Sequence, residues 1–398
     1  MNAELIDSLC FLILLLQGVA TLILLSRLLP GAFRRPPLQP QVNTSGSQSK
    51  VSVIVPTLNE AARIQPCLQG LSSQGQELQE IIVVDSYSED ETPLLVKAQA
   101  EIDSRFCLLN DPPLPANWVG RPWALHQGFL HSCDDSEWIM GVDADTQPQP
   151  GLVNSLLKVA KESGYDLISL APQFILQDPG EWWLQPALLV TLLYRFDSAG
   201  VDTANPERVM ANGQCFFCRR EVLAAVDGYT SAAQSFCDDV TLARNIASAG
   251  YKVGFFDGSK VIKVRMYQGA KETWQEWGRS LDLKDAAKTG QVWGDWWFLL
   301  LVQGLPIPLL LITWLLRGYG YDSTTVTVLM GLNLLLLLLR LVILIAIAAS
   351  YQRPAKFSWS YGLFWLSPLA DLLAVIRIGL SSLQTPTQWR GRIYSHTK

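Results

Sequence analysis

The sequence predicts an α/β fold, a mostly parallel β-sheet with helices on both faces, joined to apolar helices at both ends of the chain. Between residues 51 and 170, short apolar runs alternate with segments of helical character. Long stretches with few charges lie near the N-terminus and after residue 290. We therefore divide the 398 residues into an N-terminal transmembrane anchor (1–29), a linker (30–50), an α/β domain (51–290) and a C-terminal membrane region (291–398).

Apolar runs predict the five strands, at residues 51–55, 80–85, 105–110, 138–142 and 165–170. We expect Pro56 to end the first strand and Asn59-Glu60 to open a helix that continues to about Leu71. Residues 88–93 have the acidic, capping composition of a helix start, and residues 121–131 predict another helix. The CxxC spacing of residues 215–218 has no second pair, so its apolar filling indicates a buried strand.

The N-terminal stretch from residue 9 to residue 25 is uncharged and close to the length that spans a bilayer. A secretory signal is disfavoured, because acidic residues precede the stretch and no small-residue cleavage site follows it. Arg27, Arg34 and Arg35 come directly afterwards. By the positive-inside rule, the α/β domain lies in the cytosol.

The C-terminal region predicts further spans near residues 296–316 and 324–350. A third segment, 359–380, contains Asp371 and Arg377 and fits a span, an interfacial helix or a re-entrant segment. The closing tail is basic and aromatic, which favours a cytosolic tail and a third segment that does not span. The predicted protein is a multi-pass integral membrane protein. Residues 182–196 are apolar but too short to span, and fit an interfacial or a buried helix.

Several functions are excluded. The chain has no phosphate-binding G-x-x-x-x-G-K-[ST] loop, so it is not a P-loop protein. It has no G-x-G-x-x-G after the first strand, which disfavours a dinucleotide-binding fold, and no G-x-S-x-G nucleophile elbow. With three histidines and no H-E-x-x-H, a histidine-built metal site is not expected. The net charge of −5 gives no reason to expect nucleic-acid binding.

Acidic residues follow successive predicted strands: Glu60, Asp85, and the pair Asp143-Ala144-Asp145. Parallel strands deliver such positions to one edge of a sheet, where carboxylates repel one another unless a cation or a hydrogen-bonding ligand lies among them. On an extended chain Asp143 and Asp145 project to the same side. A solvated acidic turn is the alternative for an isolated D-x-D, but the converging row favours Mg²⁺ or Mn²⁺ shared with substrate phosphates.

These motifs resemble, in order, those of the family-2 glycosyltransferases, which have a GT-A fold. The matching segments are residues 53–60 (V-x-V-P-x-x-N-E), 82–92 (V-V-D-D-x-S-x-D-x-T), 120–128 (G-K-x-x-A-L-N-x-G), 143–145 (D-x-D) and 237–243 (E-D-x-x-L). Ser86 replaces the usual second Asp, Arg121 the Lys and Asp238 the Glu. Residues 112–120 and the closing 389–392 resemble a membrane subgroup that glycosylates polyisoprenoid-derived lipids. It includes carotenoid (myxol) 2′-O-glycosyltransferases of cyanobacteria and hopanoid-associated enzymes.

The resemblance implies a role for each matching residue on the donor side. Pro56, Glu60 and Asp85 line the nucleotide pocket, and Arg121 meets the diphosphate. Asp143 and Asp145 hold the divalent ion, and Asp143 also belongs to the nucleotide-sugar site. The alternatives are a first-turn helix acid for Glu60 and a solvated helix-start arginine for Arg121.

On the acceptor side, Asp239 is the implied general base, and Asp238 orients it or touches the acceptor. The alternative is that Asp238-Asp239 is only a helix N-terminal pair. Trp277 and Arg279 lie where processive relatives carry Q-x-x-R-W, which this sequence does not reproduce. They are candidates for acceptor contact or for interfacial anchoring, and the missing motif favours transfer of a single sugar.

The sequence therefore predicts an inverting, metal-dependent hexosyltransferase (EC 2.4). It moves a sugar from a UDP- or GDP-linked donor to a hydroxyl of a lipid, with a carotenoid as the expected acceptor. A hopanoid, a polyprenyl phosphate or another membrane lipid is the alternative acceptor. A non-catalytic, nucleotide-binding membrane scaffold is the alternative of another class.

Overall fold

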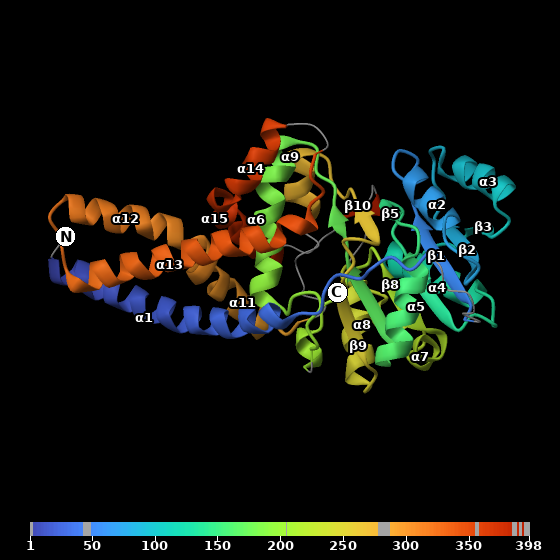
Figure 1. The fold of residues 1–398 in the computed structure, drawn as a ribbon, viewed down its shortest axis with the longest axis horizontal. Helices are drawn as coiled ribbons and strands as arrows, with labels where there is room; N and C mark the ends of the chain where they lie inside the picture. The colour runs from blue at the N-terminus through green and yellow to red at the C-terminus, as the bar shows by residue number, and fades with distance from the viewer. Residues whose placement is uncertain are drawn as a thin grey trace. The chain divides into compact units, whose positions relative to one another are not determined.

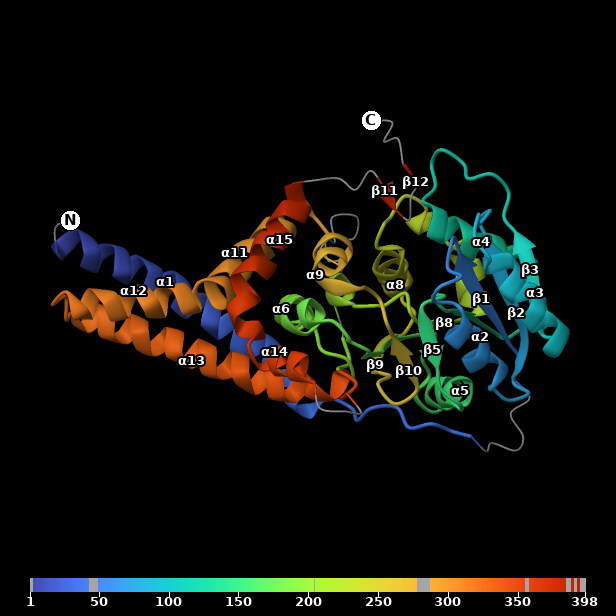
Figure 2. The same ribbon diagram turned by 90° about the horizontal axis from the view of Figure 1, so that it is seen from above.

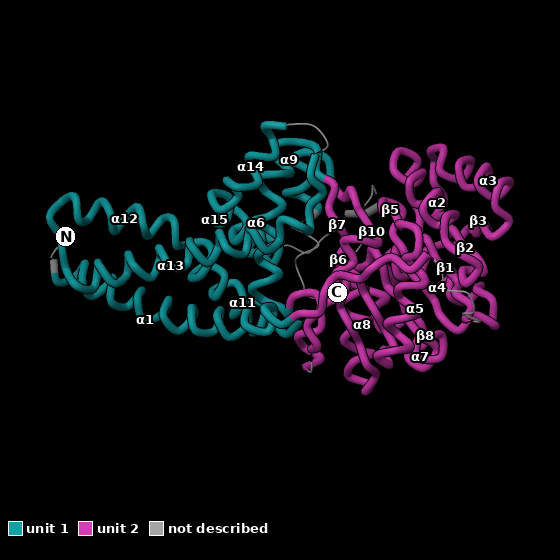
Figure 3. The backbone as a smooth tube through the Cα atoms, viewed as in Figure 1, with its two compact units in different colours: residues 1–33, 176–197, 267–385 teal, residues 34–175, 198–266, 386–398 magenta. Residues whose placement is uncertain are grey.

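The computed structural model describes residues 3–42, 49–203, 205–277, 287–354, 358–383, 388–389 and 392–393. The chain forms two compact units that interleave along the sequence (Figure 3). Unit 1 contains residues 1–33, 176–197 and 267–385, and unit 2 contains residues 34–175, 198–266 and 386–398. The segment 176–197 thus leaves the sheet-containing unit in mid-sequence and joins the helical one.

Unit 2 is built on a seven-stranded sheet of order β3-β2-β1-β4-β8-β6-β9. The strands are β1 Val51–Thr57, β2 Leu78–Asp85, β3 Phe106–Asn110, β4 Trp138–Gly141, β6 Leu167–Ala171, β8 Phe216–Arg219 and β9 Val253–Asp257. Only β8 runs antiparallel to its neighbours, β4 and β6. The predicted α/β fold with a mostly parallel sheet is confirmed. A small second sheet contains β5 Thr146–Pro148, β10 Ile262–Val264 and β7 Gln173–Phe174.

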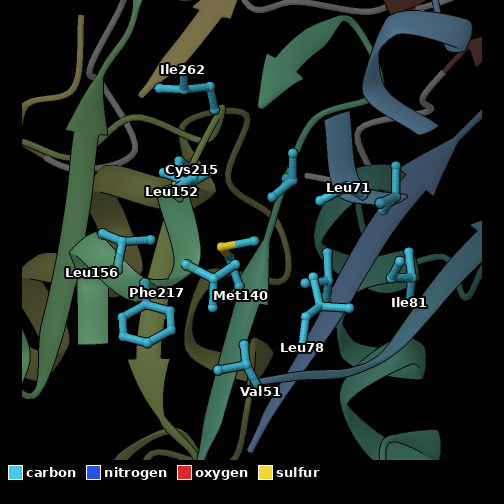
Figure 4. Packing of buried hydrophobic residues seen from close by; sticks show 14 of the residues in the cluster. Val51, Leu71, Leu78, Ile81, Met140, Leu152, Leu156, Cys215, Phe217 and Ile262 are labelled. Carbon is cyan, nitrogen blue, oxygen red and sulfur yellow. The ribbon is translucent and has the colours of Figure 1, made fainter. Parts of the chain in front are cut away.

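Both faces of the large sheet are buried, because alternate residues of β1 enter different cores. Val53 and Val55 belong to the cluster covered by α2 (Gln65–Ser72) and α5 (Leu152–Ser163), and Figure 4 shows this packing. Ile54 belongs to the opposite cluster, which α4 (Gly120–His131), α7 (Arg220–Ala225) and α8 (Asp238–Ser248) cover. The remaining helix, α3 (Thr92–Ile102), follows β2. Burial of two apolar faces explains why the strands read as continuous apolar runs.

The expected strand at residues 215–218 is present as β8. Cys215 packs in one core and Cys218 in the other, and both thiols are free and buried. Burial raises the pKa of both thiols. Their spacing therefore reflects a strand buried on two faces.

Two expected boundaries near residue 60 were wrong. Pro56 lies inside β1, which continues to Thr57. It is tolerated there because β4 pairs with β1 only as far as Ile54, so the missing N–H breaks no ladder bond on that side. The following helix begins at Gln65. Before it, Asn59 has a φ of 56°, and the Glu60 carbonyl accepts hydrogen bonds from the backbone N–H groups of Arg63 and Ile64.

Unit 1 is helical. Its α-helices are α1 Ala3–Leu28, α6 Pro179–Arg195, α9 Gly269–Glu272, α11 Thr289–Leu299, α12 Pro306–Gly318, α13 Thr324–Ile347, α14 Gly362–Trp365 and α15 Asp371–Leu383. Helices α1, α12 and α13 run side by side (Figures 1 and 2). The basic tail belongs to unit 2 and contains a short hairpin of β11 (Gln388–Trp389) and β12 (Arg392–Ile393).

Two helices are long and apolar enough to cross a membrane, residues 4–33 and 324–350. Two more pairs qualify only if each bent pair counts as one span. The pair 289–304 and 306–318 is bent by 51°, and the pair 359–365 and 367–383 by 65°. Helix α6 is a buried helix of this unit, because Trp182, Ala187 and Tyr194 are almost fully buried. Residues 182–196 were expected to form an interfacial or a buried helix, and in the structure they form a buried one.

Candidate active site

The carboxyl ends of β1, β2 and β3 are level, since Thr57 pairs with Asp85 and Asp85 with Asn110. Asp85 is buried and accepts hydrogen bonds from the Ser88 N–H (2.9 Å), the Ser88 hydroxyl (2.6 Å) and the Thr57 hydroxyl (3.1 Å). It thereby joins the ends of two neighbouring strands. Its carboxylate is rigidly placed at the sheet edge where open α/β sheets bind ligands.

Glu60 is also buried at this edge, and its Oε2 lies 3.7 Å from Arg63 Nε. Asp143 and Asp145 follow β4, which ends at Gly141, so they lie in the turn to β5 rather than on extended chain as expected. The three carboxylates are close enough to act together on the Cys67 thiol. Its pKa rises to about 12, chiefly because of burial and further because of Asp145, Asp143 and Glu60. Glu60, Asp143 and Asp145 thus lie around one buried thiol, and the predicted row that also includes Asp85 stays a prediction.

Arg121, at the start of α4, is the centre of the site. Its Nε lies 2.9 Å from Asp143 Oδ1, its Nη1 donates to Asp238 Oδ2, and its Nη2 lies 2.9 Å from the Gly213 carbonyl oxygen. Burial opposes the guanidinium charge, but the surrounding carboxylates raise the Arg121 pKa overall. One fixed cation therefore connects the D-x-D turn with the first turn of α8.

Asp238 and Asp239 form that first turn. Asp238 is buried, whereas Asp239 is partly exposed and its Oδ1 accepts a hydrogen bond from the Val240 N–H (2.9 Å). The pKa of each carboxyl is raised, first by burial and also by the charge of Asp143, while Arg121 counteracts the rise. The pair therefore lies in the first turn of a helix and also beside Arg121. A role at the helix N-terminus does not exclude a catalytic role.

The acids at the sheet edge suit a divalent ion that substrate phosphates help to bind. Within the described residues, no group of three or more His, Cys, Asp or Glu side chains could hold a metal alone. Asp143 and Asp145 supply carboxylate oxygens from one turn, and the hydroxyl and N–H of Thr146 fix that turn by donating to the Asp143 carbonyl oxygen. Mg²⁺ and Mn²⁺ commonly take one or two carboxylates plus phosphate oxygens. The residues present fit such an ion.

The remaining predicted residues are less informative. Pro56 is half-buried in β1. Trp277 is the last residue of a π-helical turn, Thr273–Trp277, in unit 1, and its side chain lies outside the described part of the structure. Arg279 lies outside the described residues altogether.

Sequence reasoning missed three residues of this region. Asp111 follows β3 and is buried, and its Oδ2 accepts a hydrogen bond from the hydroxyl of Ser86 at 2.8 Å. Its position after a predicted strand was the same signal that identified the other acids. Gly213 contacts Arg121 through its carbonyl oxygen. Burial raises the pKa of the Tyr229 hydroxyl, an effect that Arg121 opposes and Asp238 strengthens. No local pattern marks Gly213 or Tyr229.

Comparison with known proteins gives a consistent class. Residues 52–226 match the family model described as Glycosyl transferase family 2. A 4,4′-diaponeurosporenoate glycosyltransferase of Staphylococcus haemolyticus is 22% identical over 232 residues, which are 58% of this chain and 60% of that protein. The same-named protein of Staphylococcus aureus strain MRSA252 is 25% identical over 236 residues, with the same coverage. The chain thus spans about three fifths of the length of these curated relatives.

Solved structures show more distant likeness. The mannosyltransferase PcManGT of Pyrobaculum calidifontis, in complex with GDP-Man and Mn²⁺, has a TM-score of 0.48 and 17% identity, covering 92% of this chain and 99% of that one. The glucosyl-3-phosphoglycerate synthase of Mycobacterium tuberculosis, with Mn²⁺ and UDP, has a TM-score of 0.38 and 19% identity, covering 58% and 81%.

Proposed function

Because residues 52–226 belong to glycosyltransferase family 2, we propose that this protein transfers one sugar from a nucleotide sugar to a hydroxyl of a membrane lipid, with inversion. The proposed acceptor is a carotenoid. The observation that carries the proposal is the position of Arg121, which contacts both Asp143 of the D-x-D turn and Asp238 beside the candidate base. A leaving-group site and a base site thus share one cation.

In the proposed reaction, the acceptor oxygen forms a bond to the anomeric carbon while the bond from that carbon to the diphosphate breaks. Asp239 accepts the hydroxyl proton, and the nucleoside diphosphate leaves with the bonding pair. Asp143 and Asp145 would hold the Mg²⁺ or Mn²⁺, which supplies positive charge to the departing diphosphate. Arg121 adds a fixed guanidinium for the same charge. A single displacement from the face opposite the diphosphate inverts the anomeric configuration.

Two observations support a lipid acceptor. Unit 1 has two to four helices long and apolar enough to span a membrane. The staphylococcal relatives are named for 4,4′-diaponeurosporenoate, a carotenoid acid. A polyprenyl phosphate acceptor is disfavoured because its charge needs cations near Asp239 in addition to Arg121, which is assigned here to the donor diphosphate. Arg244, one of the few candidates, is buried and its Nε donates to the Val209 carbonyl oxygen. A hopanoid alcohol remains the main alternative acceptor.

The relatives' name raises a second candidate, transfer to a carotenoid carboxylate rather than a hydroxyl. A carboxylic acid is already ionised at neutral pH and needs no base, whereas a hydroxyl does. The Asp239→Asn variant separates the two candidates. It should abolish transfer to hydroxylated carotenoids while retaining nucleotide-sugar binding. Retained transfer to a carotenoid acid by this variant would assign the carboxylate as acceptor.

The decisive assay uses the purified full chain in lipid, with UDP- and GDP-sugars, Mg²⁺ or Mn²⁺ and carotenoids that carry hydroxyl or carboxyl groups. We expect transfer that EDTA removes and that either metal restores. Asp143→Ala should lose activity, whereas a non-catalytic scaffold would tolerate this change in cells. No transfer from any donor to any lipid in a broad extract, with metal present, would refute the enzyme.

A further inference from the structure

We propose that residues 359–383 do not cross the membrane but lie along its cytosolic boundary, with an exposed apolar stripe in contact with lipid acyl chains. This interaction surface belongs to unit 1 and does not depend on the proposed reaction. Its occupant is the inner leaflet of the bilayer, because contacts within unit 1 place the segment level with the inner end of the spanning helices.

The depth of the segment follows from the register of α1 and α13. The Ser323 hydroxyl donates to Asp7 Oδ1 (2.6 Å), and the Asn333 amide donates to Gln17 Oε1 (3.0 Å), each pair being separated by 316 residues. The two helices therefore run parallel and in constant register. The same offset places Arg340 level with Leu24, at the inner end of the uncharged stretch of α1.

Arg340 then fixes the depth of the bent segment. Its Nε lies 2.9 Å from Asp371 Oδ2 and its Nη2 lies 3.2 Å from the Ser367 hydroxyl, and the charged side chains are at most 5% exposed. Ser367 and Asp371 flank the start of α15, directly after the 65° bend. The bend is therefore level with the inner end of α1, not with the middle of the bilayer.

Both arms of the segment remain on this side. On one arm, Phe364 packs against Tyr351, which lies beyond the C-terminal end of α13. On the other, Arg377 Nε donates to the Trp274 carbonyl oxygen (2.7 Å), and Trp296 Nε1 donates to the Val375 carbonyl oxygen (3.1 Å). Figures 1 and 2 show α14 and α15 beside α6, away from the end of the unit where the N-terminus and the α12–α13 connection lie, and α15 also contacts α11.

The exposed face has the spacing of an amphipathic helix. Its large apolar residues are 38–70% exposed and recur at intervals of three and four: Leu366, Leu369, Leu373, Ile376, Leu380 and Leu383. The opposite face, with Asp371, Ala374, Val375 and Ile378, packs inside the unit. An apolar stripe of this length beside the inner ends of spanning helices is typical of a helix in the plane of the membrane.

Depth-dependent fluorescence quenching tests the stripe. The full chain in nanodiscs carries one environment-sensitive fluorophore at Leu380→Cys, in a Cys107→Ser, Cys133→Ser background. Lipids with a spin label near the headgroup should quench it more strongly than lipids labelled near the chain end. Leu334→Cys on α13, level with Gly18, is the matched deep control and should show the opposite order. Stronger quenching of Leu380→Cys by the lipids labelled near the chain end, or no quenching by either lipid, would overturn the proposal.

Labelling with a membrane-impermeant maleimide tests the topology independently. In intact cells, a Tyr319→Cys reporter after α12 should react. The exposed native Cys107 and a His396→Cys reporter in the tail should react only after permeabilisation. Reaction of His396→Cys in intact cells would show that residues 359–383 span, and would contradict the inference.

Discussion

Arg121 remains charged in a mostly buried position because acceptors from three separate parts of the chain surround its guanidinium: Asp143 after β4, Gly213 before β8 and Asp238 in α8. Arginine suits this place because its planar fork serves several acceptors at once, whereas a lysine would offer a single point charge. Its position depends on the absence of a side chain at residue 213.

We therefore predict that Gly213→Ala impairs donor binding without unfolding the protein. A Cβ at this position would lie 2.4 Å from Arg121 Nη2, and this flexible side-chain end would move away from it. We expect at least a tenfold rise in the KM for the nucleotide sugar, with an unchanged Tm. Gly331→Ala, where a Cβ meets open space, is the control. Unchanged kinetics of Gly213→Ala would mean that Arg121 does not act on the donor.

The raised pKa of Asp239 predicts the acid limb of the pH–rate profile. The proposed base works only as a carboxylate, and burial raises the pKa of Asp239, so kcat/KM should fall at a pH above the ordinary aspartate value of 3.8. Arg121 lowers this pKa, so Arg121→Gln should move the acid limb to higher pH in its residual activity. Lys50→Gln, which removes an exposed charge, should leave the limb in place. An acid limb that Arg121→Gln leaves unmoved would argue against Asp239 as the base.

At the scale of elements, α13 and α15 are joined by the buried pair Arg340–Asp371, which the Gln303 amide extends with a 3.1 Å hydrogen bond to Asp371. A charge in an apolar helix is tolerated only when it is paired, so each residue of the pair depends on the other. The sequence shows each charge, but not that they meet.

Removing one member of this pair should destabilise unit 1 strongly. Asp371→Ala leaves a buried guanidinium without its counter-charge, and we expect a loss of about 3–5 kcal/mol. The double variant Arg340→Met, Asp371→Leu should recover most of the lost stability. Asp322→Asn, which breaks the exposed pair with Arg317, should cost at most about 1 kcal/mol. Thermal unfolding in detergent measures the stability of all three variants. Equal losses of stability for Asp371→Ala and the double variant would contradict the pairing argument.

At the scale of the whole molecule, the two units interleave in sequence. Unit 2 is interrupted by residues 176–197, whose helix α6 belongs to unit 1. Arg27 Nη1 donates to the Tyr194 carbonyl oxygen, and the Gln303 amide donates to the Ala187 carbonyl oxygen, so α6 is bonded to α1 and to the C-terminal helical region.

This arrangement predicts how fragments behave. A fragment of residues 34–266 keeps α6 but loses the helices that bury Trp182 and Leu188, so it should aggregate without detergent. Replacing residues 176–197 by a flexible Gly/Ser linker of equal length should restore a monodisperse, soluble fragment, as measured by size-exclusion chromatography. Solubility of the unmodified fragment would show that α6 does not need unit 1.

The sequence by itself determined the α/β class, the strand ends that carry Glu60, Asp85 and the D-x-D, and the apolar helices at both ends. These features depend on the periodicity and composition of short stretches of chain, which can be recognised from the sequence alone. It placed the start of α2 too early, because Asn59 and Glu60 have the composition of a helix start but adopt a turn.

Only the tertiary structure decided what surrounds those residues. It brought Arg121 to Asp143, Gly213 and Asp238, placed α6 in the helical unit and paired Arg340 with Asp371. These contacts join residues far apart in sequence and depend on strand order and helix packing. No local pattern records them, since a buried charge is specified by its partner and that partner is chosen by the fold.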